Sequence, residues 1–100
     1  MASNDARLYR EGDALLATGT LDRAAATALW PQLAGLLDGA ARLDLGGVSR
    51  LDSAGLALLA EAAARLRSRR GGDVAVLGTP PGLEELRAAY RLSPTLDFQA

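Results

Sequence analysis

Three residue types common in active sites and metal centres are missing from this 100-residue chain, which has no cysteine, no histidine and no lysine. Without cysteine and histidine, disulfide bonds, thiol chemistry and the usual structural zinc sites are excluded. Without histidine or lysine, no ordinary base is present to activate a serine nucleophile. We therefore expect no catalytic residue, no bound metal and no cofactor.

Long apolar runs are also missing, since no stretch approaches the roughly 20 residues that a membrane-spanning helix needs. The N-terminal stretch "MASNDARLYREGD" lacks the charged-then-apolar order of a signal peptide. From both observations we expect a cytoplasmic location and no direct membrane insertion.

Charge of one sign does not accumulate either, because 11 basic and 12 acidic residues give a net charge of -1. Such a chain has no long-range field to attract phosphate backbones, so we expect no nucleic-acid partner. Four arginines between positions 65 and 70 look like an exception. No aromatic residue is interleaved with them, and a solvated helix end favoured by the helix dipole explains them equally well.

Aromatic residues are few, four in all, although 49% of the residues are hydrophobic. A core made mainly of Leu, Val and Ala favours close contact between helices and a sheet. The length suits one domain, 1–100, with one modest core.

Periodicity then predicts the elements. Two short strands are expected on either side of the turn signal Glu11-Gly12-Asp13, followed by a helix over about 22–37 that Pro31 should kink. A strand in "ARLDLGG", a loop over 48–52 and a helix over about 53–69 come next, and Gly71-Gly72 ends that helix. A strand in "DVAVLG" and a last helix after Pro80-Pro81 complete the order β-β-α-β-α-β-α, an α/β domain.

Ser53, in "SRLDSAGLALL", is the most informative polar residue. Asp52 beside it is a poor base for a hydroxyl, and the surrounding sequence "LDSAG" does not match the G-x-S-x-G motif of a nucleophile elbow. Hydrolase chemistry is therefore not expected. A structural reading remains, in which Ser53 caps the helix by accepting a hydrogen bond from a free backbone N–H.

The second reading is a docking patch. A helical wheel predicts that Leu58 faces solvent near Ala54 and Arg65, and that Trp30 lies at the edge of the apolar stripe of the first helix. If the two helices lie side by side, Trp30, Ser53, Ala54 and Leu58 form one aromatic-anchored patch. We rank Ser53 with Asp52 and Leu58 first among the partner-binding residues, Trp30 second, and Arg65 as a contact at the rim.

The segment "LDLGGVSRLDSAGLALL", followed by a helix, a strand and a last helix ending in "AAYRLSPTL", resembles the STAS domain family. The recurrent feature of that family is a strand, a loop and an Asp-Ser/Thr-x-Gly-Leu step into a helix. The chain is most similar to MlaB-like proteins, the cytoplasmic STAS subunits of the Mla phospholipid ABC transporter. This resemblance implies a STAS-like mixed sheet of four to five strands with helices packed on one face.

The resemblance also implies a noncatalytic subunit that binds and stabilises or regulates the ATPase subunit of a phospholipid ABC transporter. That ATPase works in a complex with a membrane permease, so the subunit would be peripheral to the inner membrane and would serve outer-membrane lipid asymmetry. In such proteins the residue matching Ser53 lies at the contact with the ATPase, and the tryptophan matching Trp30 belongs to the same neighbourhood.

An alternative comes from the same family. STAS domains include anti-sigma factor antagonists, in which a serine kinase anti-sigma factor is the partner and phosphorylation of the serine matching Ser53 breaks the complex. A phosphate there would add about -1.5 to -2 charges at a helix start, beside Asp44 and Asp52.

Overall fold

The structure is a computed structural model that describes residues 5–97. Its elements follow the order β1 (Arg7–Glu11), β2 (Ala14–Leu21), α1 (Arg23–Leu29), the 3-10 helix η1 (Trp30–Leu36), β3 (Arg42–Leu51), α2 (Ser53–Arg70), β4 (Ala75–Leu77) and α3 (Leu83–Ala89). The predicted order of strands and helices is confirmed.

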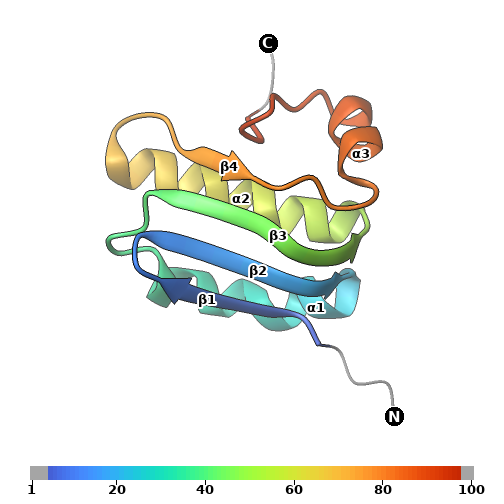
Figure 1. Cartoon of the computed structure of the whole chain (residues 1–100), viewed down its shortest axis with the longest axis horizontal. Helices are drawn as coiled ribbons and strands as arrows, with labels where there is room; N and C mark the ends of the chain where they lie inside the picture. Colours follow the sequence, from blue (N-terminus) through green and yellow to red (C-terminus); the bar gives the residue numbers. More distant parts are fainter. Residues whose placement is uncertain (1–4, 98–100) are drawn as a thin grey trace.

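One mixed sheet organises these elements, with its strands in the order β1-β2-β3-β4 (Figure 1). β1 and β2 form an antiparallel hairpin, and β2, β3 and β4 run parallel. Gly12 makes the hairpin turn with a positive φ of 62°, which glycine adopts without steric cost. The α/β fold class with a four-stranded mixed sheet is therefore as predicted.

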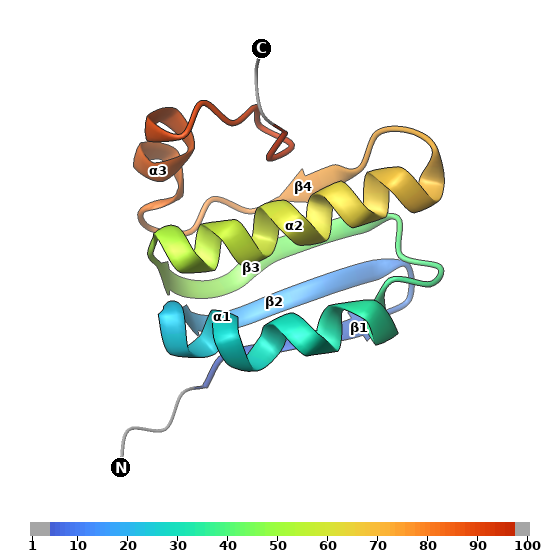
Figure 2. The same ribbon diagram turned by 180° about the vertical axis from the view of Figure 1, so that it is seen from behind.

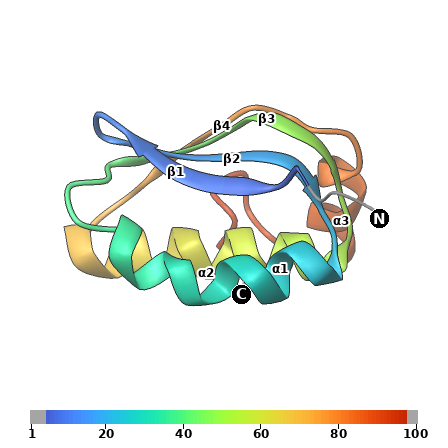
Figure 3. The same cartoon turned by 90° about the horizontal axis from the view of Figure 1, so that it is seen from below.

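The long helices lie on one face of the sheet. Figure 3 shows α1, η1 and α2 below the strands, and Figure 2 shows α1 and α2 side by side, starting at the same end of the molecule. α3 lies beyond the β4 edge, next to the first half of α2. The buried residues between these layers are mainly Leu, Ala and Val. The starts of α1, α2 and α3 therefore gather at one end of the domain.

The same local pattern begins α1 and α2. A leucine ends the preceding strand, an extended aspartate follows, and the carboxylate of that aspartate accepts a hydrogen bond from the backbone N–H three residues later. The distances are 2.9 Å from Asp22 Oδ1 to Ala25 N and 3.0 Å from Asp52 Oδ1 to Gly55 N. Because β2 and β3 are parallel neighbours with Leu21 paired to Leu51, the two helices start side by side.

The first helix changes type where Pro31 was expected to kink it. The α-helical hydrogen-bond pattern ends at Leu29, and Trp30–Leu36 continue as a 3-10 helix with Pro31 in its first turn. Proline has no N–H to donate to the carbonyl four residues back, so the α-helical ladder cannot pass this point.

The predicted loop over 48–52 is wrong for most of its length, because β3 continues to Leu51. Val48 pairs with Gly19 of β2 and is buried, and one register shift against β2 lies between Asp44 and Gly47, so the strand continues through Gly46 and Gly47. Two adjacent glycines suggested a strand end, but here they occupy exposed positions inside a strand.

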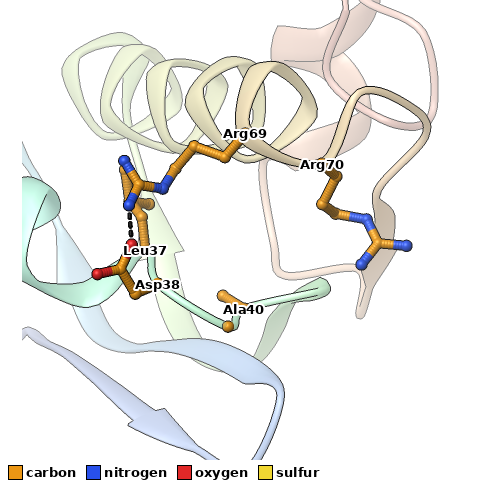
Figure 4. A pocket seen from close by; sticks show the side chains of 6 residues that line it. Leu37, Asp38, Ala40, Arg69 and Arg70 are labelled. Carbon is orange, nitrogen blue, oxygen red and sulfur yellow. Dashed lines mark ion pairs between the residues drawn. The ribbon is translucent and has the colours of Figure 1, made fainter.

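The arginines at the end of α2 are engaged with neighbouring chain, at the opposite end of the domain from the helix starts. Arg69 forms an ion pair with Asp38 across a hollow below the last turn, while Arg70 points away from that pair (Figure 4). Arg70 instead donates to the carbonyl of Asp73, and Arg67 donates to the carbonyl of Thr95. These contacts support the interpretation of the four arginines between positions 65 and 70 as part of a helix end.

Candidate functional site

Two shallow hollows flank the first turns of α2. One, of about 490 Å³, lies between α2 and the α3 region and is lined by Arg23, Ser53, Ala54, Leu56, Ala57, Ala60, Tyr90 and Leu92. The other, of about 370 Å³, lies between α1 and α2 and is lined by Arg23, Ala26, Thr27, Trp30, Pro31, Ala54 and Ala57. We call their combined lining the helix-start surface.

Aromatic side chains stand on both sides of this surface. The described residues contain three exposed large hydrophobic side chains, and two of them, Trp30 at 38% and Tyr90 at 50% exposure, line these hollows. The third, Leu77, lies on the edge strand β4. Between the two aromatic residues the ridge of α2 carries only small side chains, Ala54 and Ala57. Exposed aromatic groups around a small-residue ridge are typical of the anchors that dominate protein interfaces.

Ser53 does not cap α2, so the prediction that this residue is the N-cap is wrong. Asp52 is the N-cap, and its carboxylate accepts the hydrogen bond from Gly55 N–H. Ser53 is the first helical residue and is exposed. Its hydroxyl makes no hydrogen bond with any residue between 5 and 97. The hydroxyl is therefore free for a partner or for modification.

Leu58 was expected to face solvent, and this prediction is wrong because Leu58 is 0% exposed. The expectation placed the buried face of the helix on a narrow stripe through Leu56 and Leu59. α2 packs against β3 and also against α1 and α3. A helix with neighbours on several sides buries a wider arc, which here includes Gly55, Leu58 and Ala62. Leu58 therefore contributes to the core and not to the surface.

The other predicted site residues are only partly brought together. Trp30 and Ala54 line the same hollow, and Ser53 and Ala54 line its neighbour. Asp52 directly precedes them as the cap. Arg65 is separate, since it lines another hollow and its Nε lies 2.7 Å from Glu61 Oε2 in an ion pair along the helix.

Several residues of the helix-start surface were not anticipated, and two of them, Tyr90 and Arg23, carry an aromatic or a charged side chain. Tyr90 reaches the surface from the end of α3, which the sequence does not place relative to α2. Arg23 lines both hollows. A signal for Arg23 was present, because "LDRA" repeats "LDSA" at the end of the neighbouring strand and puts Arg23 in the position that Ser53 holds in α2.

The chemistry of this surface suits binding. The side chains of the two hollows are apolar apart from the Ser53, Thr27 and Tyr90 hydroxyls and the Arg23 guanidinium. Within residues 5–97, no group of three or more acidic side chains is arranged to hold a metal ion. None of the helices in this part of the chain has the length and hydropathy needed to span a membrane.

Comparison with known proteins assigns the family. The family model described as "Mlab, STAS domain" matches residues 5–96, which include every strand and helix of the structure. A search of curated proteins finds no significant match. The resemblance seen in the sequence is thus confirmed at the level of the family. The chain belongs to the MlaB-like STAS domain family and is an interaction and regulatory domain of that type.

Proposed function

We propose that this STAS domain is a noncatalytic subunit that docks through the helix-start surface onto the ATPase subunit of a phospholipid ABC transporter. Docking would stabilise the ATPase or tune its activity. The domain would then work at the cytoplasmic side of the inner membrane, held there by the ATPase and its membrane permease, and would serve outer-membrane lipid asymmetry.

The observation that carries this proposal is the pair of hollows beside the free hydroxyl of Ser53. Trp30 and Tyr90 offer large apolar area on either side of the Ala54–Ala57 ridge, which allows another polypeptide to approach closely. Family membership supports the same function, since the matched model is that of the MlaB-like STAS domains.

Co-purification with the ATPase subunit tests the proposal. We expect the wild-type domain and the Ser53→Ala variant to co-purify with the ATPase, because alanine suits the apolar surroundings of the hydroxyl. Ser53→Asp should lose most of the complex, since its carboxylate must be desolvated in a mainly apolar interface and would compete with the partner for the neighbouring Arg23 guanidinium. Circular dichroism should show all three proteins folded. Equal co-purification of Ser53→Asp and wild type would contradict this site.

Trp30→Ala gives an independent measure of the same surface. Its side chain is partly exposed, so its loss should weaken the complex by roughly 2 kcal/mol, as for an interface anchor, while the domain stays folded. Arg42→Ala serves as a control, because Arg42 lies on β3 away from both hollows and pairs with Asp13. Unchanged affinity of Trp30→Ala would place the contact elsewhere.

A second candidate function is supported by the same free hydroxyl. An exposed, unbonded serine at a helix start is open to a kinase, as in an anti-sigma factor antagonist. Intact-mass spectrometry of the domain from its native cell distinguishes the two functions. A phosphate adduct that Ser53→Ala removes would favour the switch, and the unmodified mass together with recovery of an ATPase and permease would favour the transporter subunit.

A further inference from the structure

The single charge on the helix-start surface is unpaired. Among residues 5–97, Arg23 is the only charged residue that lines either hollow, and it lines both. Its guanidinium makes no ion pair and no hydrogen bond with the described residues. Arg42, Arg65, Arg67, Arg69 and Arg87 pair with carboxylates within residues 5–97. Arg50 and Arg91 have no such partner among the described residues either, but neither of them lines the two hollows.

The topology explains why Arg23 stands beside Ser53. Each follows a capping aspartate, and the strands before these aspartates are parallel neighbours joined through the pair Leu21 and Leu51. Arg23 and Ser53 are thus corresponding residues of two adjacent strand-to-helix units. The cationic side chain of Arg23 and the free hydroxyl of Ser53 therefore line the same hollow.

An apolar surface with one unpaired cation selects for a specific kind of partner. When a partner covers it, water leaves the guanidinium, and the cost of this desolvation is offset only if the partner supplies an anionic group. The two hollows lie on opposite sides of the ridge formed by Ala54 and Ala57. Two apolar side chains from one polypeptide segment can fill them, with an anionic group of the same segment beside Arg23.

We infer that the docking segment of the partner carries a carboxylate flanked by two apolar side chains, and that Arg23 pairs with this carboxylate. The inference rests on the proposed function and names the chemistry of the ATPase surface that the domain recognises. Trp30 and Tyr90 border the hollows that receive the apolar groups, and Arg23 fixes the position of the segment between them. Arg suits this role because its planar guanidinium can hold a carboxylate through two parallel hydrogen bonds.

Binding of the purified ATPase subunit to Arg23 variants tests this inference. We expect Arg23→Gln to weaken the complex roughly tenfold and Arg23→Glu roughly 100-fold, because the second change sets two like charges against each other. The affinity of Arg23→Gln should also depend less on salt concentration than that of the wild type. Neither change should harm folding, since Arg23 is exposed and an acidic residue in the first turn of a helix is favourable.

Arg50→Glu is the matched control. Arg50 is an exposed arginine of β3 at the same end of the domain, it lines neither hollow, and its exchange alters the net charge equally. We expect Arg50→Glu to bind within about threefold of wild type, as surface charges outside a contact do. Restoration of Arg23→Glu binding by an acidic-to-arginine exchange in the ATPase would identify the paired carboxylate.

The outcomes distinguish the proposed docking onto the ATPase subunit from the inferred pairing of Arg23 with a partner carboxylate. If the wild type binds the ATPase, and Arg23→Glu binds equally well or no worse than Arg50→Glu, the inference about Arg23 is overturned while the docking function stands. If the wild type does not bind the ATPase, both fall. If Arg23→Glu abolishes binding to anionic phospholipid vesicles but leaves the ATPase complex intact, the anionic group belongs to a lipid and the inferred protein carboxylate is refuted.

Discussion

Gly55 offers a sharp test of how α2 is seated on the sheet. A Cβ atom built on Gly55 would lie 2.1 Å from the carbonyl oxygen of Leu21 and 2.8 Å from its Cβ. Cβ atoms in real structures essentially never lie closer than about 3.0 Å to such atoms, so the start of α2 and the end of β2 would have to separate by roughly 0.9 Å. The same carbonyl accepts a hydrogen bond from Asp52 N–H at 3.2 Å, which the separation would weaken.

Gly55→Ala should therefore destabilise the domain despite the better helix propensity of alanine. Propensity alone would stabilise by about 1 kcal/mol, whereas forcing extra volume into a packed contact costs typically 1–3 kcal/mol and sometimes more. With backbone as the obstacle and a hydrogen bond weakened, we expect the free energy of unfolding to fall by about 2 kcal/mol. Urea denaturation followed by far-UV circular dichroism measures this difference.

The matched control is Gly35→Ala in η1, where an added Cβ meets nothing within 4 Å. That variant should be as stable as wild type or more stable by up to about 1 kcal/mol. A Gly55→Ala protein as stable as wild type would refute the close approach of α2 to β2. Because Leu21 precedes the start of α1, the same variant should also misalign the helix-start surface and weaken partner binding.

The remaining predictions concern single side chains, and the same urea titration measures all of them. Asp52→Ala should lower the free energy of unfolding by about 1 kcal/mol through loss of the helix cap, and Ser53→Ala should change it by less than about 0.5 kcal/mol. A larger loss for Ser53→Ala than for Asp52→Ala would show that Ser53 is the cap. Leu58→Ala should lower the free energy of unfolding by about 3 kcal/mol, because the side chain is fully buried. Unchanged stability would show that Leu58 lies on the surface. Arg10→Ala should cost about 1–3 kcal/mol, because its guanidinium donates to backbone carbonyls at the end of η1 and in the hairpin turn, and unchanged stability would show these bonds to be unimportant.

Much of the fold was predictable from local signals. Apolar spacing located the helices, Gly71 ended α2 in the left-handed conformation that glycine favours, and Pro31 marked the point where α1 becomes a 3-10 helix. The glycine pair inside β3 misled the prediction. The position of Gly46 and Gly47 inside β3 depends on register shifts against β2. The spacing of apolar residues along one segment does not predict how that segment pairs with another strand.

The site was only partly predictable for a similar reason. Ser53 and Trp30 follow from position along their own helices, and the structure places both on adjoining hollows. Leu58 and Tyr90 depend on which other elements lie beside α2, and a helical wheel drawn for one isolated helix contains no such information. The repeated "LDRA" and "LDSA" steps could have pointed to Arg23, had the two parallel strands been aligned with each other.

The separation of the two ends of the domain has a practical consequence. The starts of α1, α2 and α3 lie at one end, while the hairpin turn and the connections over 37–41 and 71–74 lie at the other (Figures 1 and 2). A reporter sequence inserted after Gly71 should be accepted, because Gly71 and Gly72 are exposed and Gly71 can keep its left-handed conformation at the end of α2. A fluorescent tag inserted there would leave the opposite end of the molecule clear, so the domain could be followed in living cells while bound.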